Sequence, residues 1–208
     1  MSICRLKIDF LAALSRATWL SGLEALNLSN NFSRLAGSPH GDEGLLSVCR
    51  MPHLSSLRGL FAGRVDSDGM IEAILGSPHL TRLQRLTLDE LRPESVITLA
   101  RTPWPAGWRM LYLCGPSLDD RVAEALAGSE SLGQLEMLIL AGPIGDRGIR
   151  ALLDSDKLSA LQLLRLTSTT AVPALRDALR EDPRLRRLQS FHCSSFHFRK
   201  DIHYQREG

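Results

Sequence analysis

The chain has 208 residues, with 25 basic and 23 acidic side chains, and its net charge is +2. Apolar residues make up 44% and charged residues 23%, which is typical of a folded globular protein and excludes disorder along the whole chain. The near balance of charge argues against a strongly basic nucleic-acid-binding protein. Leucine is unusually frequent, with 39 copies, and its placement predicts the fold.

The first 19 residues are expected to form an N-terminal half-repeat or cap. The segment DFLAAL, which begins at Asp9, has the apolar spacing of a helix and predicts one over residues 10–16. Asp9 and Arg16 interrupt the apolar run, so neither a secretory signal nor a membrane span is predicted.

The cysteines are too far apart to indicate a secreted disulfide framework. They are Cys4, Cys49, Cys114 and Cys193. Together with the lack of a signal sequence, this spacing favours a cytoplasmic protein whose thiols are reduced and mostly buried.

A leucine pattern, L-x-x-L-x-x-L-x-L, recurs along the chain. Its first positions are residues 20, 54, 80, 105, 132, 158 and 185. The spacings are 34, 26, 25, 27, 26 and 27 residues, a period near 26 that chance does not produce. The alternation at the end of each copy sends two apolar side chains inward and their neighbours outward, as in a strand. It predicts seven short parallel strands, centred on residues 26–28, 60–62, 86–88, 111–113, 138–140, 164–166 and 191–193.

An aspartate keeps the same period, 12 residues before a leucine pattern. Asp42, Asp68, Asp120 and Asp146 each precede an apolar run of helical spacing, and their carboxylates are expected to cap the helix N-termini. Proline in the breakers that follow ends the helices and turns the chain toward the next strand. Further helices are therefore expected over residues 43–50, 69–76, 94–101, 120–127, 146–153 and 173–181.

Each unit thus consists of a breaker, a short strand, a loop and a helix. One unit cannot bury its own apolar face, so neighbouring units are expected to stack, with parallel strands on the concave side and helices on the other. This pattern resembles leucine-rich repeat proteins, and the period with a full helix is similar to the ribonuclease-inhibitor-like class. The phrases SPHL-TRLQRLTL and IGDRG-IRALLDSDKLSALQLLRL are similar to repeats of bacterial cytosolic proteins of that class.

The resemblance extends from about residue 9 to 194. It implies a horseshoe, that is, a right-handed α/β solenoid of about seven repeats of ~26 residues. Residues 20–194 are expected to form the repeat domain, and residues 195–208 a C-terminal cap and tail. The family places asparagine three residues beyond the last strand leucine. Asn31 fits this position, whereas the later units carry Val65, Leu91, Pro116, Pro143 and Thr169 there.

Two units depart from the period. The first is eight residues too long, and the extra length lies between Asn31 and Gly41, where the composition predicts a surface loop. This loop is either a simple insertion or part of a binding site. In the fourth unit Trp108 takes a leucine position and is expected in the core, while Trp104 is expected to be partly exposed.

No motif for catalysis is present, because the sequence lacks a P-loop, GxGxxG, HExxH and GxSxG. Asp119 and Asp120 could form a carboxylate pair, but their place in the repeat favours a helix cap. Four residues near the C-terminus do not have the spacing of a zinc site: His192, Cys193, His197 and His203. The chain is therefore not expected to be an enzyme or to hold a metal or cofactor.

The residues that flank the inward leucines predict a binding surface. On neighbouring strands they lie about 4.8 Å apart and form columns on the concave face, Thr87 among them. The middle of this face is apolar and its flanks are charged, as in a protein interface. The candidate protein-binding residues are Phe61, Arg85, Met110, Tyr112, Met137, Ile139, Leu163 and Arg165.

The leading hypothesis is a non-enzymatic scaffold, monomeric and cytoplasmic, that binds a protein partner through its concave face. No nucleic acid or membrane is expected as a partner. A second hypothesis is a regulator of an enzyme, either an inhibitor or a GTPase activator, for which Arg34 and Arg64 are the candidate exposed arginines. A third is a fragment of a longer repeat array. The sequence does not identify the partner.

Overall fold

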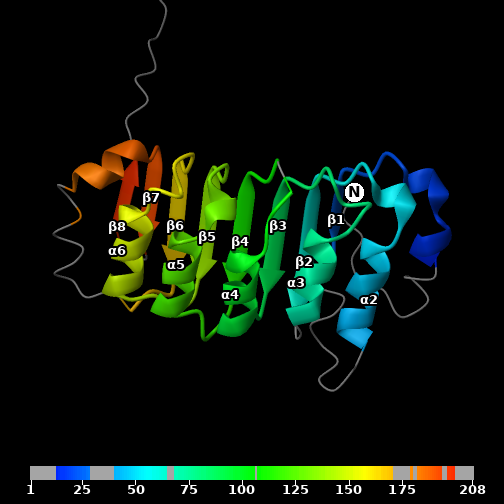
Figure 1. Ribbon diagram of the computed structural model, residues 1–208, viewed down its shortest axis with the longest axis horizontal. Coiled ribbons are helices and arrows are strands. Elements are labelled where there is room, and N and C mark those ends of the chain that lie inside the picture. Colours follow the sequence, from blue (N-terminus) through cyan, green and yellow to red (C-terminus); the bar gives the residue numbers. More distant parts are fainter. Residues whose placement is uncertain are drawn as a thin grey trace, which may run out of the picture.

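The computed structural model describes residues 13–28, 40–64, 68–105, 107–170, 179, 182–193 and 196–199. They form one eight-stranded sheet in which the strands lie side by side in sequence order (Figure 1). The strands are β1 (Ala25–Asn27), β2 (Gly59–Arg64), β3 (Arg85–Asp89), β4 (Met110–Cys114), β5 (Met137–Ala141), β6 (Leu163–Thr167), β7 (Ser190–Cys193) and β8 (Phe196–Arg199). Strands β1 to β7 pair in parallel, and β8 pairs with β7 in the antiparallel direction.

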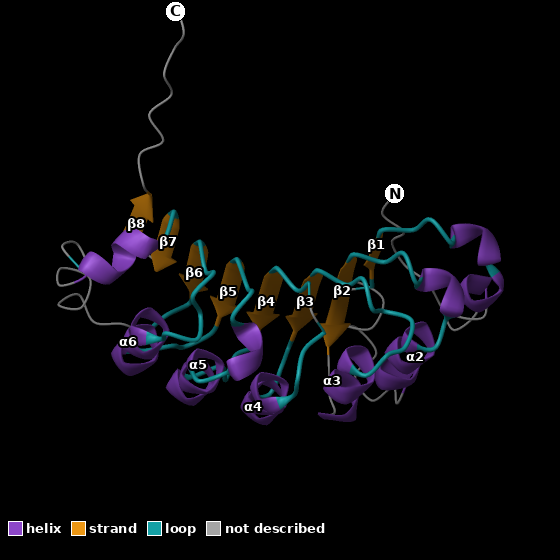
Figure 2. Ribbon diagram, turned by 45° about the horizontal axis from the view of Figure 1, so that its top comes forward, coloured by secondary structure: helices purple, strands orange, loops and turns teal. Residues whose placement is uncertain are grey.

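The α-helices form a second layer against one face of the sheet (Figure 2). They are α2 (His40–Cys49), α3 (Asp68–Leu75), α4 (Pro93–Arg101), α5 (Asp120–Ala127) and α6 (Asp146–Asp154). Short 3-10 turns precede four of the strands: η1 (Thr18–Leu20), η2 (Pro52–Leu54), η3 (Glu130–Leu132) and η4 (Pro183–Arg187). The described part is therefore a solenoid-like α/β arrangement, and none of its helices combines the length and apolarity needed to cross a bilayer.

The predicted elements agree closely with the observed ones. Six of the seven predicted strands lie inside β2 to β7, and the seventh, predicted at 26–28, is displaced by one residue in β1. The five predicted helices from 43–50 to 146–153 match α2 to α6 within three residues at each end. Residues 13–16 are helical, as the N-terminal prediction requires. The helix predicted for 173–181 lies outside the described residues except for position 179.

The strand leucines form a continuous core between the sheet and the helices. Equivalent leucines lie next to one another in register, as Leu111, Leu138 and Leu164 do on β4, β5 and β6. Nine leucines predicted to be buried are all at most 2% exposed: Leu83, Leu86, Leu88, Leu135, Leu138, Leu140, Leu161, Leu164 and Leu166. The inward register of the strands is therefore confirmed.

In three units a buried serine hydrogen-bonds to the helix of the neighbouring unit on the N-terminal side. The leucine pattern did not indicate this contact. Ser77, Ser129 and Ser155 each lie three residues before the first leucine of a pattern. Their hydroxyls donate over 2.5–2.6 Å to the carbonyl oxygens of Cys49, Ala100 and Ala127, respectively. These carbonyls lie in the last turn of a helix, where backbone acceptors have no partner within the helix. The serines therefore satisfy acceptors that the stacking of units would otherwise bury unpaired.

The predicted aspartate caps are wrong in position. Helices α3, α5 and α6 begin at the periodic aspartate itself, and α2 begins two residues before Asp42. At α5 the cap is Asp119, whose carboxylate accepts the N–H of Arg121 at 3.1 Å. Asp120 instead accepts the N–H of Gly145, in the next unit, at 2.6 Å. At this position the periodic aspartate therefore links two units.

The tryptophans of the fourth unit pack against each other. Trp108 is 4% exposed, as expected for a leucine position. Trp104 is half-buried, with its ring centroid 4.6 Å from that of Trp108 in an edge-to-face arrangement. The Trp104 indole N–H donates to the carbonyl oxygen of Leu99 at 2.8 Å. Both side chains therefore belong to the packing of this unit.

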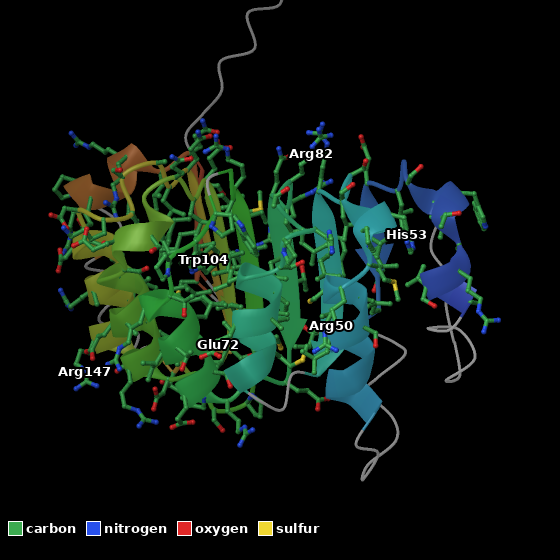
Figure 3. All side chains as sticks on the ribbon, turned by 45° about the vertical axis from the view of Figure 1, so that its right-hand side comes forward. Arg50, His53, Glu72, Arg82, Trp104 and Arg147 are labelled. Atoms are coloured by element: carbon green, nitrogen blue, oxygen red, sulfur yellow. The ribbon has the colours of Figure 1, made fainter. Side chains whose placement is uncertain are left out.

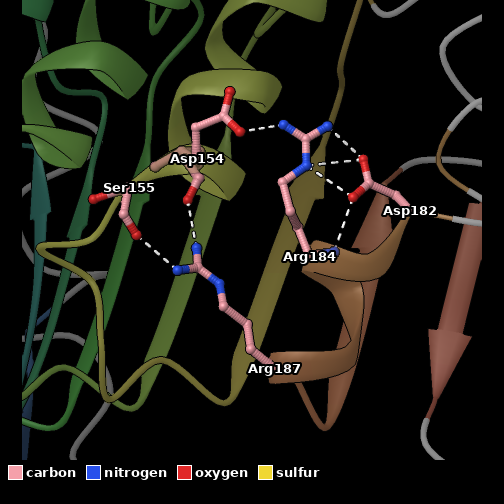
Figure 4. Close-up of polar contacts among 6 residues, drawn as sticks. Asp154, Ser155, Asp182, Arg184 and Arg187 are labelled. Carbon is pink, nitrogen blue, oxygen red and sulfur yellow. Dashed lines mark hydrogen bonds and ion pairs between the residues drawn. The ribbon is translucent and has the colours of Figure 1, made fainter.

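Two arginines hold η4 to the end of α6 (Figure 4). Arg184 forms an ion pair with Asp154, the last residue of α6. Arg187 donates to the carbonyl oxygens of Ser155 at 2.7 Å and Leu152 at 2.9 Å. A cation is favoured there, because the C-terminal carbonyls of a helix lack intrahelical partners and carry partial negative charge.

We expect Arg187→Ala to lower the free energy of unfolding by about 1–2 kcal/mol, because it leaves these carbonyls without their charged donor. Urea denaturation measures the change. The adjacent Arg186 is exposed, as Arg187 is, but makes neither of these hydrogen bonds. Arg186→Ala is therefore the matched control and should stay within about 0.5 kcal/mol of the parent. Equal effects of the two substitutions would contradict the assigned role of Arg187.

Candidate protein-binding face

Strand register brings the predicted apolar residues together. Met137 of β5 lies between Met110 of β4 and Leu163 of β6. One outward position further along, Ile139 lies beside Tyr112. These residues alternate with the buried leucines, so they lie on the sheet face opposite the helices. We name this group the central patch: Met110, Tyr112, Met137, Ile139 and Leu163.

All five side chains of the central patch are half-buried, whereas Arg85 and Arg165 are exposed. Neighbouring strands are only about 4.8 Å apart, so long outward side chains cover one another's flanks while their ends stay accessible. Among the described elements, none lies over this face, and β8 extends the sheet beside β7 (Figure 2). The central patch is thus an accessible apolar surface on a backbone held by its hydrogen-bonded neighbours.

Phe61 and Arg85 lie to one side of the central patch, over Gly59. A methyl group at Gly59 would be 3.5 Å from Cε2 of Phe61 and 3.6 Å from Nε of Arg85. Thr87, expected to project from the face, is only 8% exposed. Its register neighbours are Phe61 and Tyr112, whose larger rings flank it. Thr87 therefore lies on the predicted face, but its side chain is largely buried there.

A polar end borders the central patch, and the leucine pattern did not predict it. Strands β3 and β4 each run one residue past the second inward leucine, to Asp89 and Cys114. Burial raises the pKa of Asp89, and the charge of Glu90 raises it further. Burial is also the main reason that the pKa values of Tyr112 and Cys114 are raised, and Asp89 adds to both. The Tyr112 hydroxyl and the Cys114 thiol are therefore neutral near pH 7 and suited to hydrogen bonding.

The two buried cysteines are poorly placed for thiol chemistry. Cys49 and Cys193 are buried, as predicted. Burial raises the pKa of Cys49 to about 11 and also raises that of Cys193, which disfavours the reactive thiolate. Cys114 is half-buried, and Cys4 lies outside the described residues.

The other candidate sites are the histidines near the C-terminus and the two arginines considered for a GTPase activator. The β7–β8 register sets His197 opposite His192, and His203 lies outside the described residues. Within the described ranges, no group of three His, Cys, Asp or Glu residues is placed to hold a metal ion. Arg34 and the side chain of Arg64, the candidate arginines of a GTPase activator, also lie outside the described part.

The arrangement therefore supplies an apolar contact surface with charged flanks and a polar end. It comprises all eight residues predicted for binding, which lie on β2 to β6 and share one face of the sheet. Comparison with known proteins adds no function to this surface: no family model matches the sequence, and no curated protein matches it.

Proposed function

We propose that this chain is a leucine-rich repeat horseshoe of the ribonuclease-inhibitor-like class and that it binds a protein partner through its concave face, without catalysis. The observation that carries the proposal is the central patch, in which three adjacent strands present accessible apolar side chains in register. Large contiguous apolar patches are uncommon on monomeric proteins, and such patches often mark contact sites.

The arrangement of the layers supports the repeat class. Parallel strands alternate with helices along one axis, and equivalent leucines stack from unit to unit. Strands pack about 4.8 Å apart, whereas helices need about 8–10 Å between their axes. A regular stack of such units curves, with the strands on the inner side, and the central patch then lines the concavity.

The composition of the face supports a protein partner. Tyrosine, methionine and arginine are enriched in protein interfaces, and Tyr112, Met110 and Met137 lie at its centre with Arg85 and Arg165 at its flanks. The strands hold these side chains in place before binding. Less conformational entropy is then lost on association, so that more of the contact energy appears as affinity.

We expect Tyr112→Ala to weaken binding of the partner by about 1–2 kcal/mol or more, roughly tenfold in Kd, because an aromatic anchor is lost. The partner is first captured on the wild-type chain from the cells that produce this chain. The affinity of the partner for each variant is then measured by calorimetry. The fold should remain intact, because the Tyr112 ring lies on the sheet face opposite the helices and is not part of the core between the sheet and the helices.

Arg150→Ala is the control, since Arg150 is exposed on α6, on the opposite side of the sheet. It should change the affinity little. If Arg150→Ala abolishes binding while Tyr112→Ala and Ile139→Ala leave it unchanged, the concave face is not the binding surface.

A further inference from the structure

Four arginines gather where strands β2, β3 and β4 begin. Arg58 and Arg109 directly precede β2 and β4, Arg85 is the first residue of β3, and Arg82 lies in the turn before it. The N–H of Arg85 donates to the carbonyl oxygen of Arg58 at 2.9 Å, and the N–H of Arg109 donates to the carbonyl oxygen of Gln84 at 2.8 Å, so these positions lie side by side. All four side chains are exposed, and Figure 3 shows Arg82 at the edge of the molecule where the strands begin. We name this group the arginine rim: Arg58, Arg82, Arg85 and Arg109.

Two glutamates border the arginine rim, one on each outer side. Glu24 forms an ion pair with Arg58 at 3.6 Å, and Glu136 forms one with Arg109 at 3.4 Å. Each pair joins the guanidinium Nε to one carboxylate oxygen, and its side chains are 44–67% exposed. Such exposed pairs add little to stability, so the carboxylates of a bound partner can compete for these arginines.

The two inner arginines have no acidic neighbour of this kind. Among the described residues, neither Arg82 nor Arg85 forms a hydrogen bond or an ion pair through its side chain. The position between Arg58 and Arg109 holds Gln84, which carries no charge. A guanidinium offers five N–H donors in a planar fork that matches a carboxylate. The middle of the arginine rim therefore presents unpaired donors and positive charge.

The arginine rim is continuous with the central patch. Arg85 lies in register beside Met110, and Met110 lies beside Met137. Two strand spacings separate Arg85 from Met137, or about 10 Å. A partner segment of about three extended residues spans this distance, so one short segment can contact both groups.

We propose that the partner bound by the concave face is an acidic protein segment, in which at least two carboxylates lie directly beside apolar side chains. The carboxylates pair with Arg82 and Arg85, and the apolar side chains cover Met110 and Met137. The ion pairs fix the orientation of the segment and speed its association, while the apolar contacts supply most of the affinity. This inference rests on the proposed function, because it names the class of partner for the same face.

The surroundings of the arginine rim favour a protein over a nucleic acid. Interfaces with nucleic acids are polar and strongly positive. Here the arginines border the apolar side chain of Met110, and Glu24 and Glu136 lie at both outer sides, where they would repel a continuous phosphate backbone. Carboxylates next to apolar groups therefore match this surface better than phosphates do.

Peptide display on the full chain tests the proposal. Random peptides are selected on wild type and, separately, on the double variant Arg82→Glu/Arg85→Glu. Wild type is expected to enrich aspartate and glutamate beside apolar residues, and the double variant is expected to lose this enrichment. Arg150→Glu is the charge-matched control, because Arg150 is exposed on α6, on the opposite side of the sheet. It should select the same acidic sequences as wild type.

A charge swap tests the pairing itself. For a peptide selected on wild type, Arg85→Glu should raise Kd about tenfold or more. Lysine in place of one glutamate of the peptide should weaken its binding to wild type and restore its binding to Arg85→Glu. Because Arg85 is exposed, circular dichroism should show the same fold in wild type and variant.

Tyr112→Ala separates this inference from the proposed function. Selected peptides that lose affinity for Tyr112→Ala but show no excess of acidic residues would overturn the acidic partner and leave binding through the concave face intact. Acidic peptides that depend on Arg85 but not on Tyr112, or a wild-type chain that selects no peptide, would contradict both. A fluorescent dT oligonucleotide that binds more tightly than the selected peptides, and is lost in Arg85→Glu, would assign the arginine rim to nucleic acid and overturn the inference.

Discussion

Replacing Leu138 by alanine is expected to lower the free energy of unfolding by about 2–5 kcal/mol. Its side chain is fully buried and lies in register between Leu111 and Leu164. Stacked units support both flanks of the resulting cavity, which limits local collapse. For a chain of this size each kcal/mol lowers Tm by about 2–4 °C, so thermal denaturation measures the loss.

The neighbouring Met137 provides the matched control, because its side chain points to the other face of the same strand and is half-buried. Met137→Ala should destabilise the chain clearly less than Leu138→Ala. An unchanged Tm in Leu138→Ala would contradict the inward register of β5.

A methyl group at Gly142 is expected to cost about 3 kcal/mol or more, at the upper end of overpacking effects. Gly142 follows β5, and its added Cβ would lie 2.6 Å from the carbonyl oxygen of Leu118 and 2.7 Å from the Cβ of Leu118. These atoms belong to the loop of the preceding unit and cannot move away without disturbing it. Gly142 is not among the residues of positive φ, so the cause is steric and not conformational.

Gly128→Ala tests this explanation. Gly128 caps the C-terminus of α5, is exposed, and would place its Cβ no closer than 3.5 Å to other atoms. We expect it to change the free energy of unfolding by no more than about 0.5 kcal/mol in urea denaturation. If Gly142→Ala is as mild as Gly128→Ala, close approach between loops is not what requires glycine at 142.

The strands and their core could be predicted from the sequence because two independent signals agree. Alternation places Leu86 and Leu88 on one face, and the 26-residue period repeats that choice in every unit. A register error of one residue would expose every strand leucine, so the pattern allows only one solution. The apolar centre of the opposite face follows directly, as the pairing of Tyr112 with Ile139 shows.

Contacts between units could not be predicted in the same way. The role of Asp120 depends on where the N–H of Gly145 lies, and Ser155 acts on a carbonyl 28 residues away. The serine recurs three residues before the first leucine of three patterns, but its partner is set by the stacking of the units and cannot be read from the sequence. Thr87 is buried because its register neighbours are aromatic, which a pattern of single positions does not capture. The position of Asp89 on this face could have been predicted, because it continues the outward alternation of β3 by one step.

Site-specific photo-crosslinking in the cells that produce the protein tests the proposed binding through the concave face most directly. A photoreactive residue at Ile139, in the central patch, should form a covalent adduct with a distinct partner protein, and Tyr112→Ala should reduce its yield. The same residue at Arg150, on exposed α6, should form none. Adducts from position 150 without adducts from position 139 would contradict binding through the concave face.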